Sequence, residues 1–62
     1  MRHYWFEITD ENSEECGFEF IVGADNEQDA WEIARDYFGD WELECYGECS
    51  EEDAEMSGLD EY

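Results

Sequence analysis

Charge constrains this chain more than any other feature of its sequence. Asp and Glu together number 21, against two Arg and no Lys, which leaves a formal net charge of −19 on 62 residues. Like charges repel one another in a compact state, so a fold has to leave nearly all of these carboxylates in water. The core must therefore come from the few apolar positions that remain.

Aromatic residues are the largest group among those apolar positions, with four Phe, four Tyr and three Trp. Few aliphatic residues together with high net charge is the composition of a disordered chain. The aromatic residues recur periodically, however, and each can bury roughly 150 to 250 Å². We therefore expect one folded domain over residues 1–62, because a chain of this length has no room for a second.

Two stretches in the first third of the chain have the two-residue period of half-buried strands. The first spans Arg2 to Thr9 and the second begins at Phe18, with a polar run at 10–15 between them. The alternating apolar residues are Tyr4, Phe6 and Ile8 in the first stretch and Phe18, Phe20 and Val22 in the second. This pattern predicts a β-hairpin.

A helix is predicted next, capped by Asp25 or Asn26 and ending at about Phe38, with Gly39 as its stop signal. Acidic residues in its first turn favour the positive end of the helix dipole. Its predicted buried stripe consists of Ala30, Ile33, Ala34, Tyr37 and Phe38, with Trp31 at the edge.

The last third of the chain predicts one further strand and a short helix. Trp41, Leu43 and Cys45 alternate with polar residues up to Gly47, where we expect the strand to end. Ser50, with Asp53 three residues later, resembles a helix cap before Gly58. The expected fold class is a small α+β domain, ββαβ, with a three-stranded antiparallel sheet, one helix packed on one face and a possible short C-terminal helix.

The sequence also favours a cytoplasmic address. The first residues lack the cationic and apolar regions of a signal peptide. No apolar run approaches the roughly 20 residues that a membrane-spanning helix needs, and anionic membranes would repel this chain. Three cysteines without an export signal favour reduced thiols over a disulfide framework.

Metal binding is the first alternative function to weigh. A calcium loop beginning at Asp10 would have Glu15 at its required Gly and Ile21 at its bidentate acid, and one beginning at Asp25 would have Ala30 at the Gly. A zinc site could in principle use the three cysteines and the single histidine; these are Cys16, Cys45, Cys49 and His3. Buried thiols in the core are the simpler interpretation of the cysteines, so we predict no metal and no cofactor.

Catalysis is not predicted. An acid–base enzyme needs carboxylates whose pKa values are pushed apart by burial or by a neighbour, whereas these carboxylates lie on the expected solvent faces. A domain of this size also has little room for a ligand pocket. We therefore expect a protein that is not an enzyme and has no catalytic residues.

With metal binding and catalysis set aside, the acidic residues themselves form the candidate site. They recur at spacings that place several of them on one face of a strand or helix. Acids two apart on a strand lie about 6.7 Å apart, and acids four apart on a helix are neighbours. Duplex DNA presents a comparable density of negative charge to the Lys and Arg side chains of proteins that bind it. The predicted partner-binding residues are Glu27, Asp29, Glu32, Asp36, Glu42, Glu44, Glu48, Glu51, Glu52, Asp53 and Glu55.

In size, charge and sheet-plus-helix pattern the chain resembles, as a class, the small acidic DNA-mimicking inhibitors of phages and mobile elements, which include anti-CRISPR proteins. No shared residue motif carries this resemblance, so no functional residue is transferred from it. The resemblance implies a monomeric, stoichiometric inhibitor in the cytoplasm of an infected bacterial host. Its partner would be a basic nucleic-acid-binding protein such as a CRISPR effector complex, with no direct binding of nucleic acid. The alternatives are a metal-binding (calcium or zinc) acidic protein and an acidic inhibitor of a nuclease or toxin.

Overall fold

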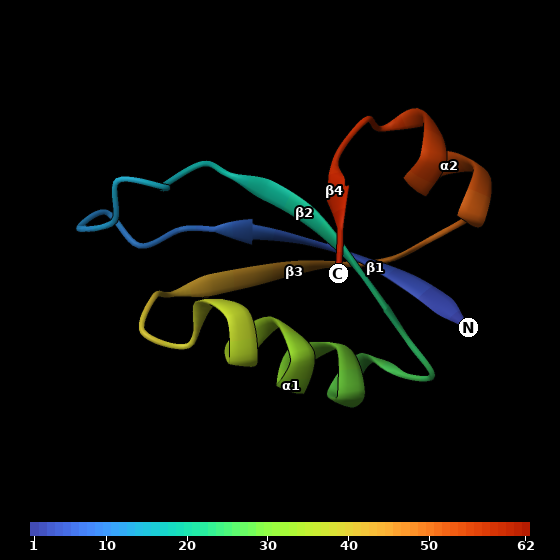
Figure 1. Ribbon diagram of the computed structural model, residues 1–62, viewed down its shortest axis with the longest axis horizontal. Coiled ribbons are helices and arrows are strands. Elements are labelled where there is room, and N and C mark those ends of the chain that lie inside the picture. Colours follow the sequence, from blue (N-terminus) through green and yellow to red (C-terminus); the bar gives the residue numbers. More distant parts are fainter.

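A computed structural model describes all 62 residues as one small α+β domain with a single sheet between two helices (Figure 1). The strand order across the sheet is β3-β1-β2-β4. The elements in chain order are β1 (Arg2–Ile8), β2 (Glu19–Ala24), α1 (Glu27–Phe38), β3 (Leu43–Cys49), α2 (Glu51–Met56) and β4 (Asp60–Glu61). The class is as predicted, but the sheet has four strands, and it is mixed because β4 pairs with β2 in parallel.

The predicted hairpin is confirmed. Strands β1 and β2 pair antiparallel without a register shift, from Arg2 opposite Ala24 to Glu7 opposite Glu19. The loop between them closes at Gly17, whose φ of 92° suits a residue without a Cβ. Beyond the strand ends, Gly17 N donates to Ile8 O at 2.8 Å, which fixes the register of the hairpin.

Helix α1 begins as predicted, because the Asn26 side chain caps it by accepting a hydrogen bond from Asp29 N. Ala30 and Ala34 are fully buried against the sheet. Tyr37, predicted to be buried, is 61% exposed, because the neighbour its ring meets there is the C-terminal segment rather than the centre of the sheet. The helix does end at Gly39, but with a right-handed φ of −63° rather than a left-handed cap.

Aromatic packing forms the main core on the α1 face of the sheet. The Phe6 and Phe20 rings stack with centroids 5.5 Å apart, and Phe20 also contacts Phe38 at 4.7 Å. Trp31 meets Phe6 edge-on at 5.0 Å. The buried members of this core are Tyr4, Phe6, Ile8, Phe20, Val22, Ala24, Ala30 and Ala34.

Strand β3 differs from its prediction at both ends. It begins after Trp41, at Leu43, and it continues through Gly47 to Cys49. The register against β1 shifts between Trp5 and Phe6, so that β3 has one extra residue at this point and forms a β-bulge. Gly47, with a φ of 103°, therefore belongs to the bulge and does not terminate the strand.

The short C-terminal helix is also confirmed. Ser50 Oγ accepts a hydrogen bond from Asp53 N at 3.0 Å and caps α2. Helix α2 lies across the sheet from α1 (Figure 1), where Ile21 and Ala54 are buried outside the main core. The chain then returns as β4, and the ring of Tyr62 packs edge-on against Phe20 at 5.6 Å. This last segment escaped sequence prediction because it contains only two paired residues, both acidic.

Candidate partner-binding surface

All eleven predicted partner-binding acids are exposed. The structure does not gather them into one patch, because α1 and α2 lie on opposite faces of the sheet and β3 lies at its edge. Three groups result, and each belongs to one region. Glu27, Asp29, Glu32 and Asp36 lie on α1; Glu42, Glu44 and Glu48 lie on or just before β3; Glu51, Glu52, Asp53 and Glu55 lie on α2.

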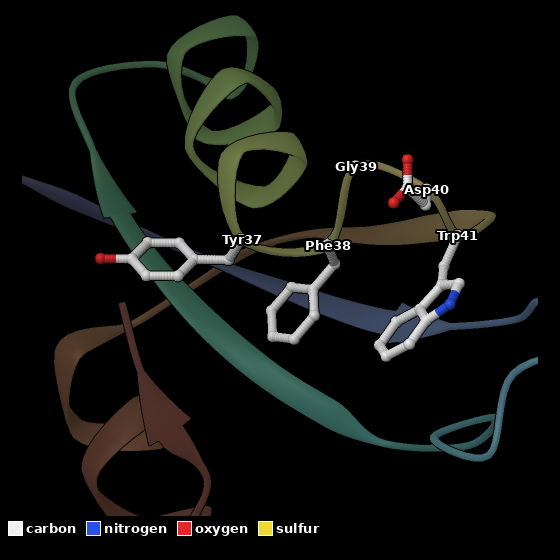
Figure 2. A pocket seen from close by; sticks show the side chains of 5 residues that line it. All are labelled: Tyr37, Phe38, Gly39, Asp40 and Trp41. Atoms are coloured by element: carbon white, nitrogen blue, oxygen red, sulfur yellow. The ribbon is translucent and has the colours of Figure 1, made fainter.

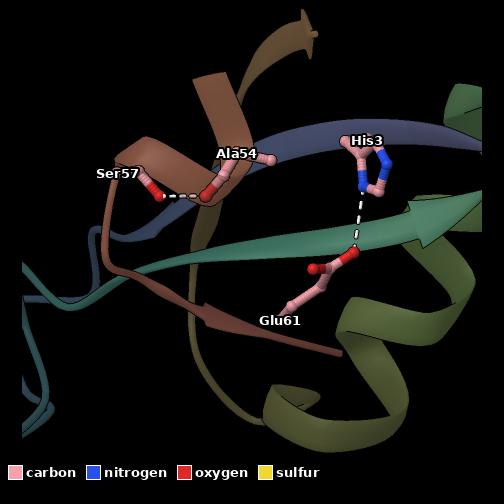
Figure 3. Close-up of polar contacts among 4 residues, drawn as sticks. All are labelled: His3, Ala54, Ser57 and Glu61. Carbon is pink, nitrogen blue, oxygen red and sulfur yellow. Dashed lines mark hydrogen bonds and ion pairs between the residues drawn. The ribbon is translucent and has the colours of Figure 1, made fainter. Parts of the chain in front are cut away.

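Almost none of this charge is neutralised within the molecule. The one contact at ion-pair distance joins His3 Nδ1 to Glu61 Oε1 at 2.9 Å (Figure 3); it is an ion pair only when the imidazole is protonated, and that buried Nδ1 has no hydrogen-bond partner. Arg35 lies over the Trp31 ring at 5.3 Å instead of pairing with a carboxylate. Arg2 lies beside Tyr4 and Glu48, and the hydrogen bond with Tyr4 is the main cause of its raised pKa. The carboxylates are therefore available to an external cation.

Some of the acids also stabilise the helices that carry them. Glu27 and Asp29 occupy the first turn of α1, and Asp29 Oδ2 accepts a hydrogen bond from Asn26 Nδ2 at 3.3 Å. The first turn of α2 is wholly acidic, from Glu51 to Asp53. Negative charge near a helix N-terminus is favourable because it complements the helix dipole. These positions thus have a structural role beside any role in binding.

The acids of the sheet have no such local benefit. Glu7 lies directly opposite Glu19 on β2 and directly opposite Glu44 on β3. These three residues, which we call the carboxylate row, cross three adjacent strands on the face away from α1. Like charges placed directly opposite one another in a sheet are destabilising. The row is therefore a cost to the fold.

Two aromatic side chains hold the carboxylate row in position. Trp5 Nε1 donates a hydrogen bond to Glu19 Oε1 at 3.0 Å, and Tyr46, the extra residue of the bulge, donates its hydroxyl hydrogen to Glu7 Oε1. The bond with Glu7 is the main cause that raises the pKa of Tyr46 to about 12, with smaller effects of desolvation and of the Glu44 charge. Two carboxylates of the row are thus oriented in advance of any partner.

Glu7 and Glu19 are not among the eleven predicted partner-binding acids, although their alternation with core residues predicts that they can lie on the same sheet surface. The pairing of β1 with β2 confirms that they do. Their alignment with Glu44 depends on the register of β1 against β3, which joins residues distant in the sequence.

The four residues considered for a zinc site do not form one group. Cys45 packs against the main core, whereas Cys49 follows the bulge and lies opposite His3. Cys16 is exposed in the hairpin loop. Desolvation raises the pKa of Cys45 and of Cys49, which favours the neutral thiol over the metal-binding thiolate.

In the candidate calcium loop that begins at Asp10, the Asp10 carboxylate already accepts hydrogen bonds from the backbone. This residue lies in the connection between β1 and β2, where its two carboxylate oxygens accept hydrogen bonds from Asn12 N at 2.9 Å and Glu42 N at 3.4 Å. Nowhere in the structure are three or more His, Cys, Asp or Glu side chains grouped so that they could hold a metal ion.

The surface has one hollow, of about 130 Å³, where α1 ends. It is lined by the consecutive residues from Tyr37 to Trp41, and the rings of Phe38 and Trp41 point to the same side, away from the Asp40 carboxylate (Figure 2). Pockets that enclose small ligands usually measure about 300 to 1,000 Å³. The hollow is smaller than such a pocket.

Comparison with protein-family models, with curated proteins and with solved structures finds no match to this chain. Neither helix has the length or apolar character that crossing a membrane requires.

Proposed function

We propose that this protein is a non-enzymatic inhibitor that mimics DNA and occupies the basic nucleic-acid-binding channel of a host defence complex. A CRISPR effector is the first target to test, because such a complex holds nucleic acid in a positively charged channel. The inhibitor acts as a monomer in the cytoplasm of the infected cell, binds its target stoichiometrically, and needs neither a cofactor nor nucleic acid.

One observation carries this proposal. The 19 net negative charges are distributed over a molecule whose longest extent is 32 Å, which is roughly one charge per 1.7 Å, the linear charge density of duplex DNA. A mixed-sign surface would be enough for solubility. A surface this unbalanced repels itself and therefore favours a function outside the molecule.

Physical considerations also predict how such an inhibitor binds. Complementary charge accelerates encounter and makes affinity depend on salt, whereas a single exposed acid contributes little. Binding therefore depends on groups of acids. Of the three groups, that of β3 adjoins the carboxylate row through Glu44.

The test is displacement of a fluorescent DNA duplex from a purified CRISPR effector complex by increasing amounts of the protein. We expect displacement at about one protein per complex, weakening steeply as salt rises from about 50 to 200 mM. The variant Glu42→Gln, Glu44→Gln, Glu48→Gln should displace DNA about tenfold less well, and each single change should matter little.

The matched control is the helix variant Glu27→Gln, Glu32→Gln, Asp36→Asn, which removes the same number of charges from α1. If both triple variants displace DNA as well as the unaltered protein, the acidic faces are only solvated and mimicry is wrong. If no effector or other basic nucleic-acid-binding protein releases DNA, while a nuclease or toxin loses activity by another route, the inhibitor is of that other class.

A further inference from the structure

The two edges of the sheet are protected to different degrees. The β2 edge is covered by β4, where Phe20 pairs with Asp60 and Ile21 with Glu61, and Tyr62 N donates to Ile21 O at 2.8 Å. The outer edge of β3 has no neighbouring strand, because β3 pairs only with β1. A free edge presents unpaired backbone N–H and C=O groups that can accept another strand.

The two sides of β3 offer different chemistry along this edge. On the α1 side, Leu43 and Cys45 are only half-buried and form the open flank of the main core. On the other side, Glu44 of the carboxylate row and the neighbouring Tyr46 are exposed. An added strand would therefore meet apolar side chains on one face and carboxylates on the other.

Charge decides which strand can occupy this edge. A second copy of the chain would bring the acids of its own β3 against Glu42 and Glu44, and like charges opposite one another are destabilising. A segment with Lys or Arg at alternate positions would place opposite charges there and apolar residues beside Leu43. Main-chain hydrogen bonds would supply affinity in either case, so the side chains select the partner.

We propose that the free edge of β3 is the docking site for an extended basic segment of the target protein, which adds to the sheet as a fifth strand. This inference rests on the proposed function and gives it a specific contact. The segment has alternating basic and apolar residues, with the basic ones facing the carboxylate row. The bulge at Gly47 limits the regular part of the edge to the half of β3 that precedes it.

The probe is a short synthetic peptide in which Lys and Val alternate, and its control has the same composition with all Lys residues at one end. Amide hydrogen exchange of the unaltered protein is followed at about 150 mM salt, where long-range attraction between exposed charges is largely screened. We expect the alternating peptide to slow exchange at residues 43–45, before the bulge, and the control peptide to leave these amides unchanged.

Two charge-matched variants test the selection by side chains. The edge variant Glu42→Lys, Glu44→Lys changes two acids that precede the bulge on the side of the carboxylate row, and it should bind the alternating peptide about tenfold less tightly, since cross-strand attraction becomes repulsion. The helix variant Glu32→Lys, Asp36→Lys has the same net charge and should bind within about twofold of the unaltered protein.

Equal loss of affinity in the two variants, or slowed exchange spread over the whole molecule, would overturn the edge site in favour of diffuse attraction. The two proposals also fail separately. DNA displacement without slowed exchange in β3 contradicts the edge site and supports mimicry. Slowed exchange in β3 with a target that keeps its DNA supports the edge site and contradicts mimicry.

Discussion

The two faces of this sheet use the same alternation of side chains for opposite purposes. On the face toward α1, Phe6 and Phe20 are completely buried in an aromatic core. On the other face, Ile21 is buried outside that core, while the neighbouring positions carry the carboxylate row. Aromatic packing on one face stabilises the fold, and repulsion among the carboxylates on the other face destabilises it. A chain with few aliphatic residues can therefore keep this charge only because its aromatic face is well packed.

The two faces should differ most in stability when adjacent residues on opposite faces of β2 are truncated. Phe20→Ala removes a ring that contacts Phe6, Phe18, Phe38 and Tyr62, and it should lower the free energy of unfolding by about 3 to 5 kcal/mol. In a domain this small, such a loss approaches the whole stability. Urea titration followed by circular dichroism measures the change.

The matched variant is Ile21→Ala, which lies one residue further along β2 on the face toward α2. Ile21 is equally buried but lies outside the main core, so its truncation should cost about 2 to 3 kcal/mol. A loss in Ile21→Ala equal to or larger than that in Phe20→Ala would contradict the view that the α1 face carries most of the stability.

The second prediction compares two exposed acids with opposite effects on stability. Glu44→Gln relieves repulsion within the carboxylate row and should raise the free energy of unfolding by about 0.2 to 1 kcal/mol. Glu27→Gln removes a favourable charge from the first turn of α1 and should lower it by about 0.3 to 1 kcal/mol.

Thermal unfolding between about 10 and 200 mM NaCl measures both effects, because salt screens exposed charges. The melting temperature of the unaltered protein should rise with salt, and it should rise less in Glu44→Gln. If both variants change stability in the same direction, the row is no more strained than the helix surface.

The third prediction involves the least change in stability. It concerns three residues of β3 at alkaline pH. The folded protein holds the proton of Tyr46 up to a pKa of about 12, above the ordinary value of 10, and burial also raises the pKa values of Cys45 and Cys49 above 9.0. The unfolded chain releases these protons first, so their stabilising contribution is complete below about pH 9 and is lost as pH rises toward 12.

The melting temperature should therefore fall across that range, and absorbance of tyrosinate should show one step near pH 12. Tyr46→Phe should abolish that step, and Tyr37→Phe, which removes a tyrosine exposed at the end of α1, should retain it. Loss of the step in Tyr37→Phe instead would contradict the hydrogen bond between Tyr46 and Glu7.

Local signals in the sequence were enough to predict much of this fold. The hairpin and both helix caps follow from alternation and from the short-range hydrogen bonding of Asn26 and Ser50. The exposure of Tyr37 could not be predicted, because helical periodicity does not show where the sheet ends. Strand β4 could not be predicted either, since two acidic residues form no pattern and its pairing depends on how α2 directs the chain.

For the candidate surface too, the sequence predicts what depends on local pattern, but not what depends on contacts between distant residues. The exposure of the eleven acids could be predicted because charged residues without partners avoid burial. The carboxylate row depends on contacts among Glu7, Glu19 and Glu44, which only the register of three strands brings together. That register in turn depends on the bulge at Gly47, where glycine had suggested the end of a strand.

The bulge has a consequence for how this sequence can vary. The extra residue lies between Cys45 and Gly47, so that Leu43 and Cys45 face α1 before the bulge and Glu48, opposite Tyr4, faces the same side after it. Deleting Tyr46 would leave the pairing of both halves unchanged and restore a regular ladder, but it would remove the hydroxyl that donates to Glu7. Homologous chains that lack this residue should therefore keep the two faces of the strand and lose the side chain that orients Glu7.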